Sequence, residues 1–237
     1  MLGHYAFRPR LVPTLAMVLV LPLFVSLGFW QFNKALAKQA LQAELDQRSQ
    51  GGAIQLAPPF ADGELLRFRH VAVRGHFEPE RQIFLDNRIH REQAGYHVLT
   101  PLRIDGSDTR VLVNRGWIPA EADHRQVPAV ATPTTPVELE GIVVLPPRRV
   151  FRLAPEAPGW HALWQNLDLE AYGTAASFTP LPVVIQLDAA SPAGFAREWP
   201  RPDERMEKHL SYALQWAGFA IALVGFWLVA SLRRRAS

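Results

Sequence analysis

Two long apolar runs bracket the chain. No charged residue occurs between Arg10 and Lys34, and none occurs between Lys208 and Arg233. As α-helices, both runs would be roughly 35 Å long, which is enough to cross a hydrocarbon core of about 30 Å. The pattern therefore predicts transmembrane helices at residues 11–33 and 209–232, with short terminal segments at 1–10 and 233–237.

Residues 34–208 follow a different pattern. Residues 33–50 favour a helix that continues the first span, and it should end at Gly51–Gly52. Short β-prone runs separated by Pro, Gly and Asp come next, at 69–77, 81–88, 96–104, 109–118, 137–145 and 182–187. The segments "EPE" (78–80) and "DGSD" (105–108) have the composition of hairpin turns, and the prolines of residues 119–202 argue against long helices there. We predict a mainly β domain, an antiparallel sandwich or barrel, between the two spans.

The distribution of charge predicts the topology. The formal net charge is +3, but five arginines (8, 10, 233, 234 and 235) lie beyond the two apolar runs. Without them, 20 basic residues remain against 22 acidic ones, so the middle domain is close to neutral and has no nucleic-acid footprint. Positive charge at both ends predicts cytoplasmic termini and a middle domain on the opposite side. That side is the periplasm in a bacterium or the intermembrane space in a mitochondrion.

A cleaved signal peptide is the alternative for the first run. Arg8 and Arg10 suit its basic region, and Ala35–Ala37 resembles a cleavage site. The apolar run, however, is longer than the ~7–15 residues usual for a signal peptide. We therefore expect a retained anchor. The chain has no Arg-rich, Ser-rich transit peptide before it, which favours a multi-pass protein of the bacterial inner membrane.

Most catalytic signatures are missing from the sequence. It has no phosphate-binding Gly-rich loop, no GxSxG and no HExxH. The chain contains no cysteine and three methionines, so thiol catalysis, thiolate metal sites and copper handling are not expected. A periplasmic enzyme on a membrane anchor is a minor alternative without a set of residues behind it.

The outer ends of the two spans carry the candidate site. "LGFWQFNK" (27–34) and "KHLSYALQW" (208–216) should lie at the same depth, with Trp30 and Gln31 near His209, Tyr212 and Trp216. The last three are spaced i, i+3 and i+7, which indicates one helical stripe. A plain aromatic belt explains the aromatic residues, and packing explains the small residues Ser211, Gly218, Ala222 and Gly225. A histidine at the edge of a span is also a functional hypothesis, since imidazole beside an apolar, aromatic wall suits a porphyrin iron.

Five segments in order resemble the Surfeit-locus family, the Surf-type assembly proteins of cytochrome c oxidase. They are LGxWQ (27–31), GxF (75–77), GxxxxTPL (95–102), VLVNRGWIP (111–119) and HLSYALQW (209–216). Lys34 stands where this family more often has an arginine. The resemblance extends over most of the chain.

The resemblance implies a non-enzymatic factor that helps to place haem a in subunit I of an aa3-type oxidase. It assigns haem binding to His209 as an axial ligand, with Trp30, Gln31, Tyr212 and Trp216 around the same site. Subunit I, the haem a synthase and membrane lipid are the implied partners. The rival interpretation is a scaffold that stabilises subunit I without touching haem. Arg115 could bind a haem propionate, but we expect "NRGW" (114–117) to be structural, with Gly116 permitting a tight turn.

Overall fold

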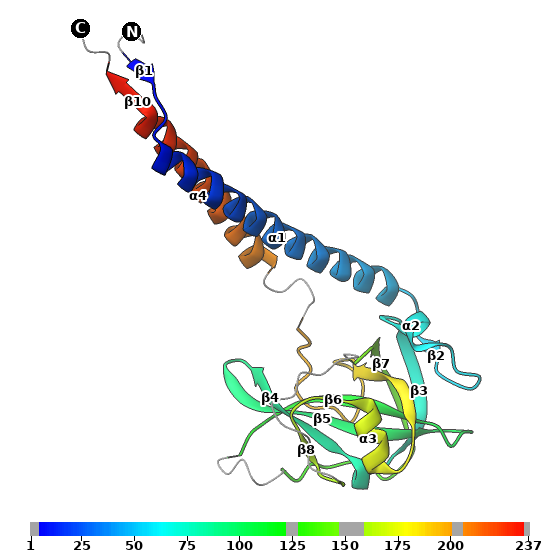
Figure 1. The fold of residues 1–237 in the computed structure, drawn as a ribbon. Helices are drawn as coiled ribbons and strands as arrows, with labels where there is room; N and C mark the ends of the chain where they lie inside the picture. Colours follow the sequence, from blue (N-terminus) through cyan, green and yellow to red (C-terminus); the bar gives the residue numbers. More distant parts are fainter. Residues whose placement is uncertain (1–4, 122–127, 147–158, 201–205, 235–237) are drawn as a thin grey trace. The chain divides into compact units, whose positions relative to one another are not determined.

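The two apolar runs form the two long helices of the computed structural model, which describes residues 5–121, 128–146, 159–200 and 206–234. Helix α1 spans Leu11–Ser49 and helix α4 spans Met206–Ser231 (Figure 1). The predicted continuation of the first helix beyond residue 33 is confirmed. The chain divides into a helical unit, residues 1–43 with 200–237, and a β unit, residues 44–199.

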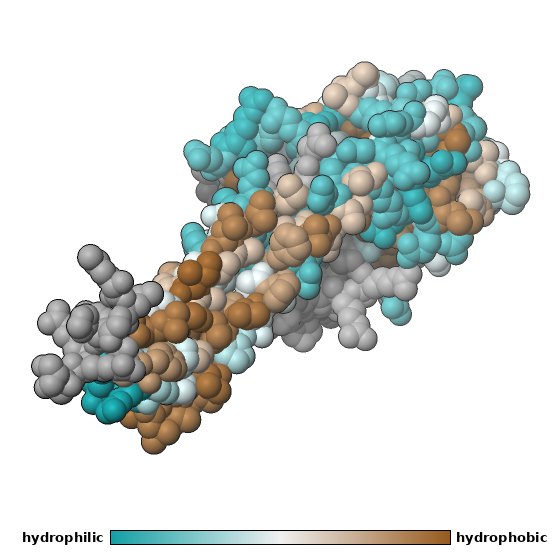
Figure 2. All heavy atoms as spheres, turned by 90° about the horizontal axis from the view of Figure 1, so that it is seen from above, coloured by the Kyte–Doolittle hydropathy of each residue, from teal (hydrophilic) through white to brown (hydrophobic). Residues whose placement is uncertain are grey.

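Within the helical unit, α1 and α4 run antiparallel. Short strands β1 (Tyr5–Phe7) and β10 (Leu232–Arg234) pair at the ends of the chain. Nearby, the Trp227 indole N–H donates to Thr14 Oγ1 at 2.9 Å. Both helices are long and apolar enough to cross a membrane. The brown surface of this unit in Figure 2 shows the side chains that a bilayer would cover.

The β unit is built around a small closed barrel. Its strands are β3 (His70–Phe77), β7 (Val137–Val144), β9 (Pro180–Leu187), β6 (Arg110–Pro119) and β5 (Gln93–Ile104), hydrogen-bonded in that order. The barrel closes where β3 also pairs with β5, at Gly75↔Ile104. A Cβ at Gly75 would clash with the carbonyl oxygen of Arg103, so glycine permits this close approach.

Shorter elements extend the barrel. Strand β4 (Ile83–His90) pairs with β5, β8 (Leu163–Trp164) with β4, and β2 (Ile54–Gln55) with β3. The turns α2 (Gly63–Leu66) and η1 (Pro79–Arg81) connect strands. Helix α3 (Leu169–Ala176) is N-capped by the Asp168 carboxylate and covers one side of the barrel (Figure 1).

Two main apolar clusters hold the β unit together. The first fills the barrel with alternate residues of β3 and β7, such as Val71, Val73 and Leu139, together with residues of β5, β6 and β9. The second lies under α3, where Tyr172 and Trp164 pack on Leu112 and Val184. Strand β6 is buried on both faces because it contributes to both clusters, which explains its nearly continuous apolar sequence.

The six predicted strands and the mainly β fold class are confirmed, with two corrections to the pairing. "DGSD" does join a hairpin, β5 to β6. "EPE" does not: η1 turns the chain away, and β4 pairs with β5 instead of β3. The sheet is also not purely antiparallel, because β6 pairs with β9 in parallel. That pair joins strands far apart in sequence, which hairpin signals cannot predict.

Candidate functional site at the head of the second helix

His209 lies in the first turns of α4 and contacts α1. Its Nδ1 atom is 2.8 Å from Oε1 of Gln31, and both side chains are partly buried. An amide oxygen can only accept a hydrogen bond, so Nδ1 carries the proton and donates it. In a neutral imidazole this leaves a lone pair on Nε2, the form in which histidine binds a metal.

About two helical turns further along α4, Trp216 packs against Gly28, where α1 has no side chain. A Cβ at Gly28 would lie 3.5 Å from Cβ of Trp216 and 3.7 Å from the carbonyl oxygen of Ala213. The Trp216 ring is 5.6 Å from that of Phe24 and 5.7 Å from that of Phe219, measured between centroids. Gly28 therefore faces Trp216 next to an aromatic cluster, with room for a side chain no larger than that of alanine.

Trp30 and Tyr212 are more exposed than Gln31, His209 and Trp216. Their side chains are 51% and 50% exposed, and Trp30 is covered on one face by the Lys34 ammonium, 5.0 Å from the ring centroid. Helical geometry explains why Tyr212 is exposed. At about 100° per residue, Trp216 falls within about 20° of His209, whereas Tyr212 is about 60° away.

An apolar groove of about 440 Å³ runs along the two helices, and neither His209 nor Gln31 is among its lining residues. Phe24, Gly28 and Phe32 of α1 and Leu210, Ala213 and Ala217 of α4 line it. The sequence-based prediction did not include this groove, although the i, i+4, i+8 spacing of its α1 residues was visible. It assigned the close approach instead to a stripe containing Gly218 and Gly225, but a Cβ at either of them would meet nothing within 4 Å.

Arg115 is a structural residue of the β unit. Its side chain is 1% exposed. The guanidinium donates to the carbonyl oxygens of Ala131 and Ala193 and to Thr132 Oγ1, each at 2.7 Å. Burial lowers its pKa to about 10. With its donors engaged in the core, the guanidinium cannot reach a haem propionate, as we expected.

Gly116 is structural for a reason other than the predicted turn, because β6 continues to Pro119. Its φ is 116°, and a Cβ would meet the carbonyl of Ala196. Trp117 and Ala196 form a β-bridge at this point. Glycine therefore lets the segment after β9 close onto β6.

The chain is similar to known proteins over most of its length. The model of the SURF1 family matches residues 18–221. Surfeit locus protein 1 of Mus musculus is 28% identical over 222 residues, covering 88% of this chain and 72% of the relative. The SURF1-like protein of Rickettsia bellii is 27% identical over 226 residues, covering 89% and 87%. Surfeit locus protein 1 of Homo sapiens is 28% identical over 225 residues, covering 87% and 73%.

Proposed function

The chain belongs to the SURF1 family, and we propose that it binds haem a at His209 and presents it to subunit I of an aa3-type cytochrome c oxidase. Family membership supports a role in cytochrome oxidase assembly. To this we add that haem a is the bound group, that His209 binds it and that subunit I receives it. In this account the protein acts by binding and handing on haem, without catalysing a reaction.

The observation that carries the proposal is the hydrogen bond between His209 and Gln31. Gln31 holds the imidazole ring in one orientation with Nε2 as the electron-pair donor. Haem iron takes an axial imidazole, and the porphyrin face needs an apolar surface beside it. The apolar groove begins at Phe32 and Leu210, the sequence neighbours of Gln31 and His209, and offers a surface of this kind. We infer that His209 would hold the haem iron and that these apolar side chains would face the porphyrin.

The expected topology suits delivery at the membrane surface. Arg233 follows the far end of α4, and Arg8 and Arg10 precede α1. Positive-inside topology puts these ends in the cytoplasm of a bacterium and the β unit in the periplasm. His209, at the opposite end of α4 from Arg233, then lies at the outer interface of the inner membrane. Haem a would be held there, within reach of subunit I and of the haem a synthase.

Complementation tests the proposal against the scaffold alternative. The full chain, His209→Ala and the control His76→Ala are produced in a bacterium that lacks its own family member, and haem a per subunit I is measured in isolated membranes. We expect the wild type and His76→Ala to restore haem a, and His209→Ala to lose most of it at equal protein level. Full restoration by His209→Ala would contradict haem binding at this residue and support the scaffold.

A further inference from the structure

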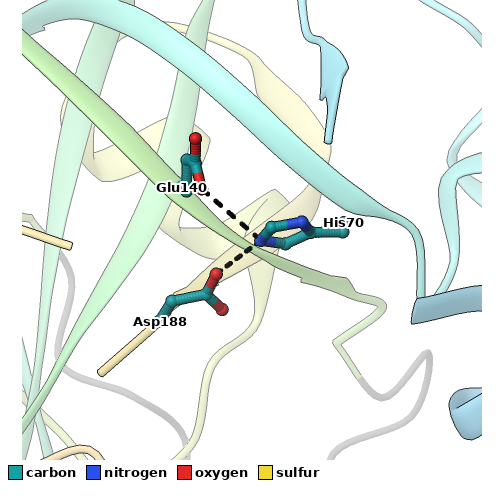
Figure 3. Close-up of side chains that lie close together, drawn as sticks. All are labelled: His70, Glu140 and Asp188. Atoms are coloured by element: carbon teal, nitrogen blue, oxygen red, sulfur yellow. Dashed lines mark hydrogen bonds and ion pairs between the residues drawn. The ribbon is translucent and has the colours of Figure 1, made fainter. Parts of the chain in front are cut away.

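Three ligand-type side chains converge at one end of three neighbouring barrel strands. His70 begins β3, Glu140 lies in β7, and Asp188 directly follows β9 (Figure 3). The register brings them together: Glu140 is paired with Ala72, two residues from His70, and Gly141 is paired with Leu187. The Asp188 N–H donates to the carbonyl of Glu140 at 3.0 Å.

The distances suit a small cation. His70 Nε2 is hydrogen-bonded to Asp188 Oδ2 and lies 4.0 Å from Glu140 Oε2. The three ligand atoms all lie within 4.8 Å of one another. Ligands on a tetrahedral zinc ion, at bond lengths of about 2.0–2.2 Å, are roughly 3.3 Å apart. Small rotations of the carboxylates are enough to reach that spacing, since Glu140 is 57% exposed and Asp188 33%.

The balance of charge separates this cluster from the other histidine–carboxylate pairs. Asp105, beside His76, is also paired with Arg74, and Glu198, beside His90, with Arg91. Within the described ranges, no arginine or lysine forms an ion pair with Glu140 or Asp188. Two carboxylates therefore face one imidazole, and a divalent cation would compensate their charge.

The backbone around the ligands is held independently of their side chains. The Arg197 guanidinium donates to the carbonyl oxygens of Asp188, Ala189 and Ser191, at 2.7, 2.8 and 2.5 Å. The Ser191 hydroxyl accepts from the Glu140 N–H at 3.1 Å. These contacts fix the backbone of the segment after β9 against β7, so that only the ligand side chains have to be ordered when an ion binds.

We propose that His70, Glu140 and Asp188 bind one Zn²⁺ ion on the β unit. One imidazole nitrogen and two carboxylate oxygens are zinc ligands in proteins, and water would complete the shell. The ion would join β3, β7 and the segment after β9, which are far apart in the sequence. This site is independent of haem binding at His209.

The test is a Zn²⁺ titration of the metal-stripped, tag-free full chain in detergent, in competition with a chromophoric chelator. We expect one equivalent to bind to the wild type and to His76→Ala, the matched histidine–carboxylate control. Binding should be at least tenfold weaker in His70→Ala and in Glu140→Gln. Saturating Zn²⁺ should also raise the melting temperature of the wild type by roughly 5 °C, and that of His70→Ala by much less.

Glu140→Gln guards against misfolding as the cause of lost binding, because this exposed side chain contributes little to the core. The circular dichroism spectrum of metal-free Glu140→Gln should match that of the metal-free wild type. The proposal is overturned if the wild type takes up no Zn²⁺ at micromolar concentration, or if His70→Ala and Glu140→Gln bind as tightly as the wild type.

Discussion

Nδ1 of His209 and Oε1 of Gln31 lie 2.8 Å apart, and this hydrogen bond joins the two apolar helices at the head of α4. It sets the tautomer of the histidine, so that Nε2 is the atom available to a metal. Gln31, near the end of the apolar run of α1, is therefore the residue that orients the His209 ring. Gln31 thereby determines which nitrogen of His209 is available to a metal.

Replacing Gln31 with Leu should weaken haem a retention about tenfold, because the ring loses the acceptor that orients it. The measurement is the fraction of haem a that stays with purified protein after gel filtration. Gln215→Leu is the matched control, since Gln215 is exposed on α4. Equal retention by Gln31→Leu and Gln215→Leu would show that the hydrogen bond does not tune the site.

At Gly28, the size of the substitution should decide the outcome. Alanine places its Cβ 3.5 Å from Trp216, an ordinary van der Waals contact, and should leave the protein unchanged. Leucine overfills the contact, at a cost of about 1–3 kcal/mol, and should push the helices apart beside His209. Haem a retention and the near-ultraviolet circular dichroism of the tryptophans should therefore change in Gly28→Leu and not in Gly28→Ala. Normal behaviour of Gly28→Leu would argue against close packing at this point.

Arg115→Met should destabilise the β unit by about 3 kcal/mol, because it leaves buried carbonyl oxygens and a threonine hydroxyl without their donor. Arg115→Lys should also lose stability, since an ammonium cannot reproduce the planar fork of the guanidinium. Arg74→Met, at a side chain that is 64% exposed, is the control and should change stability little. Urea unfolding followed by tryptophan fluorescence checks the series. A stable Arg115→Met variant would assign the arginine to something other than packing.

His97 should make the β unit sensitive to acid. Burial, with Arg88 and His90 nearby, lowers the pKa of His97 to about 4, against 6.5 in the unfolded chain. Between these values the unfolded state binds more protons, so stability is full above pH 6.5 and falls as the pH drops toward 4. The loss approaches about 3 kcal/mol.

In His97→Gln this part of the pH dependence should disappear. Melting temperatures between pH 4 and 7 should therefore fall less steeply in the variant than in the wild type, with His76→Ala as the control for an exposed histidine. Identical slopes in His97→Gln and the wild type would mean that His97 is protonated as easily in the folded state as in the unfolded one.

Local patterns predict much of the fold. The absence of charge over residues 11–33 and 209–232 was enough to place both helices, and alternation such as "HVAVRGHF" was enough to place β3. The closure of the barrel was not predictable, because it depends on pairs such as Gly75↔Ile104 and Asn114↔Gln186 that are distant in sequence. The same holds for the convergence of His70, Glu140 and Asp188.

The candidate site was predicted in part. The two apolar runs were enough to place Gln31 near His209, whereas Trp216 lies about two turns further along α4, against Gly28. The exposure of Trp30 and Tyr212 follows from the rotation of each helix about its own axis, which the apolar pattern alone does not give. Arg115 shows the opposite case: a charged residue inside a strand suggests a ligand, and only its three-dimensional neighbours show that it is structural.

Binding of haem a at His209 can be measured by an optical spectrum of the purified protein. Wild type, His209→Ala and His76→Ala are co-produced with haem a synthesis, purified in detergent and compared at equal protein concentration. The account predicts a haem a spectrum for the wild type and His76→Ala, and its loss in His209→Ala. Equal haem a in all three proteins, or none in a wild type that still restores the oxidase, would contradict the account.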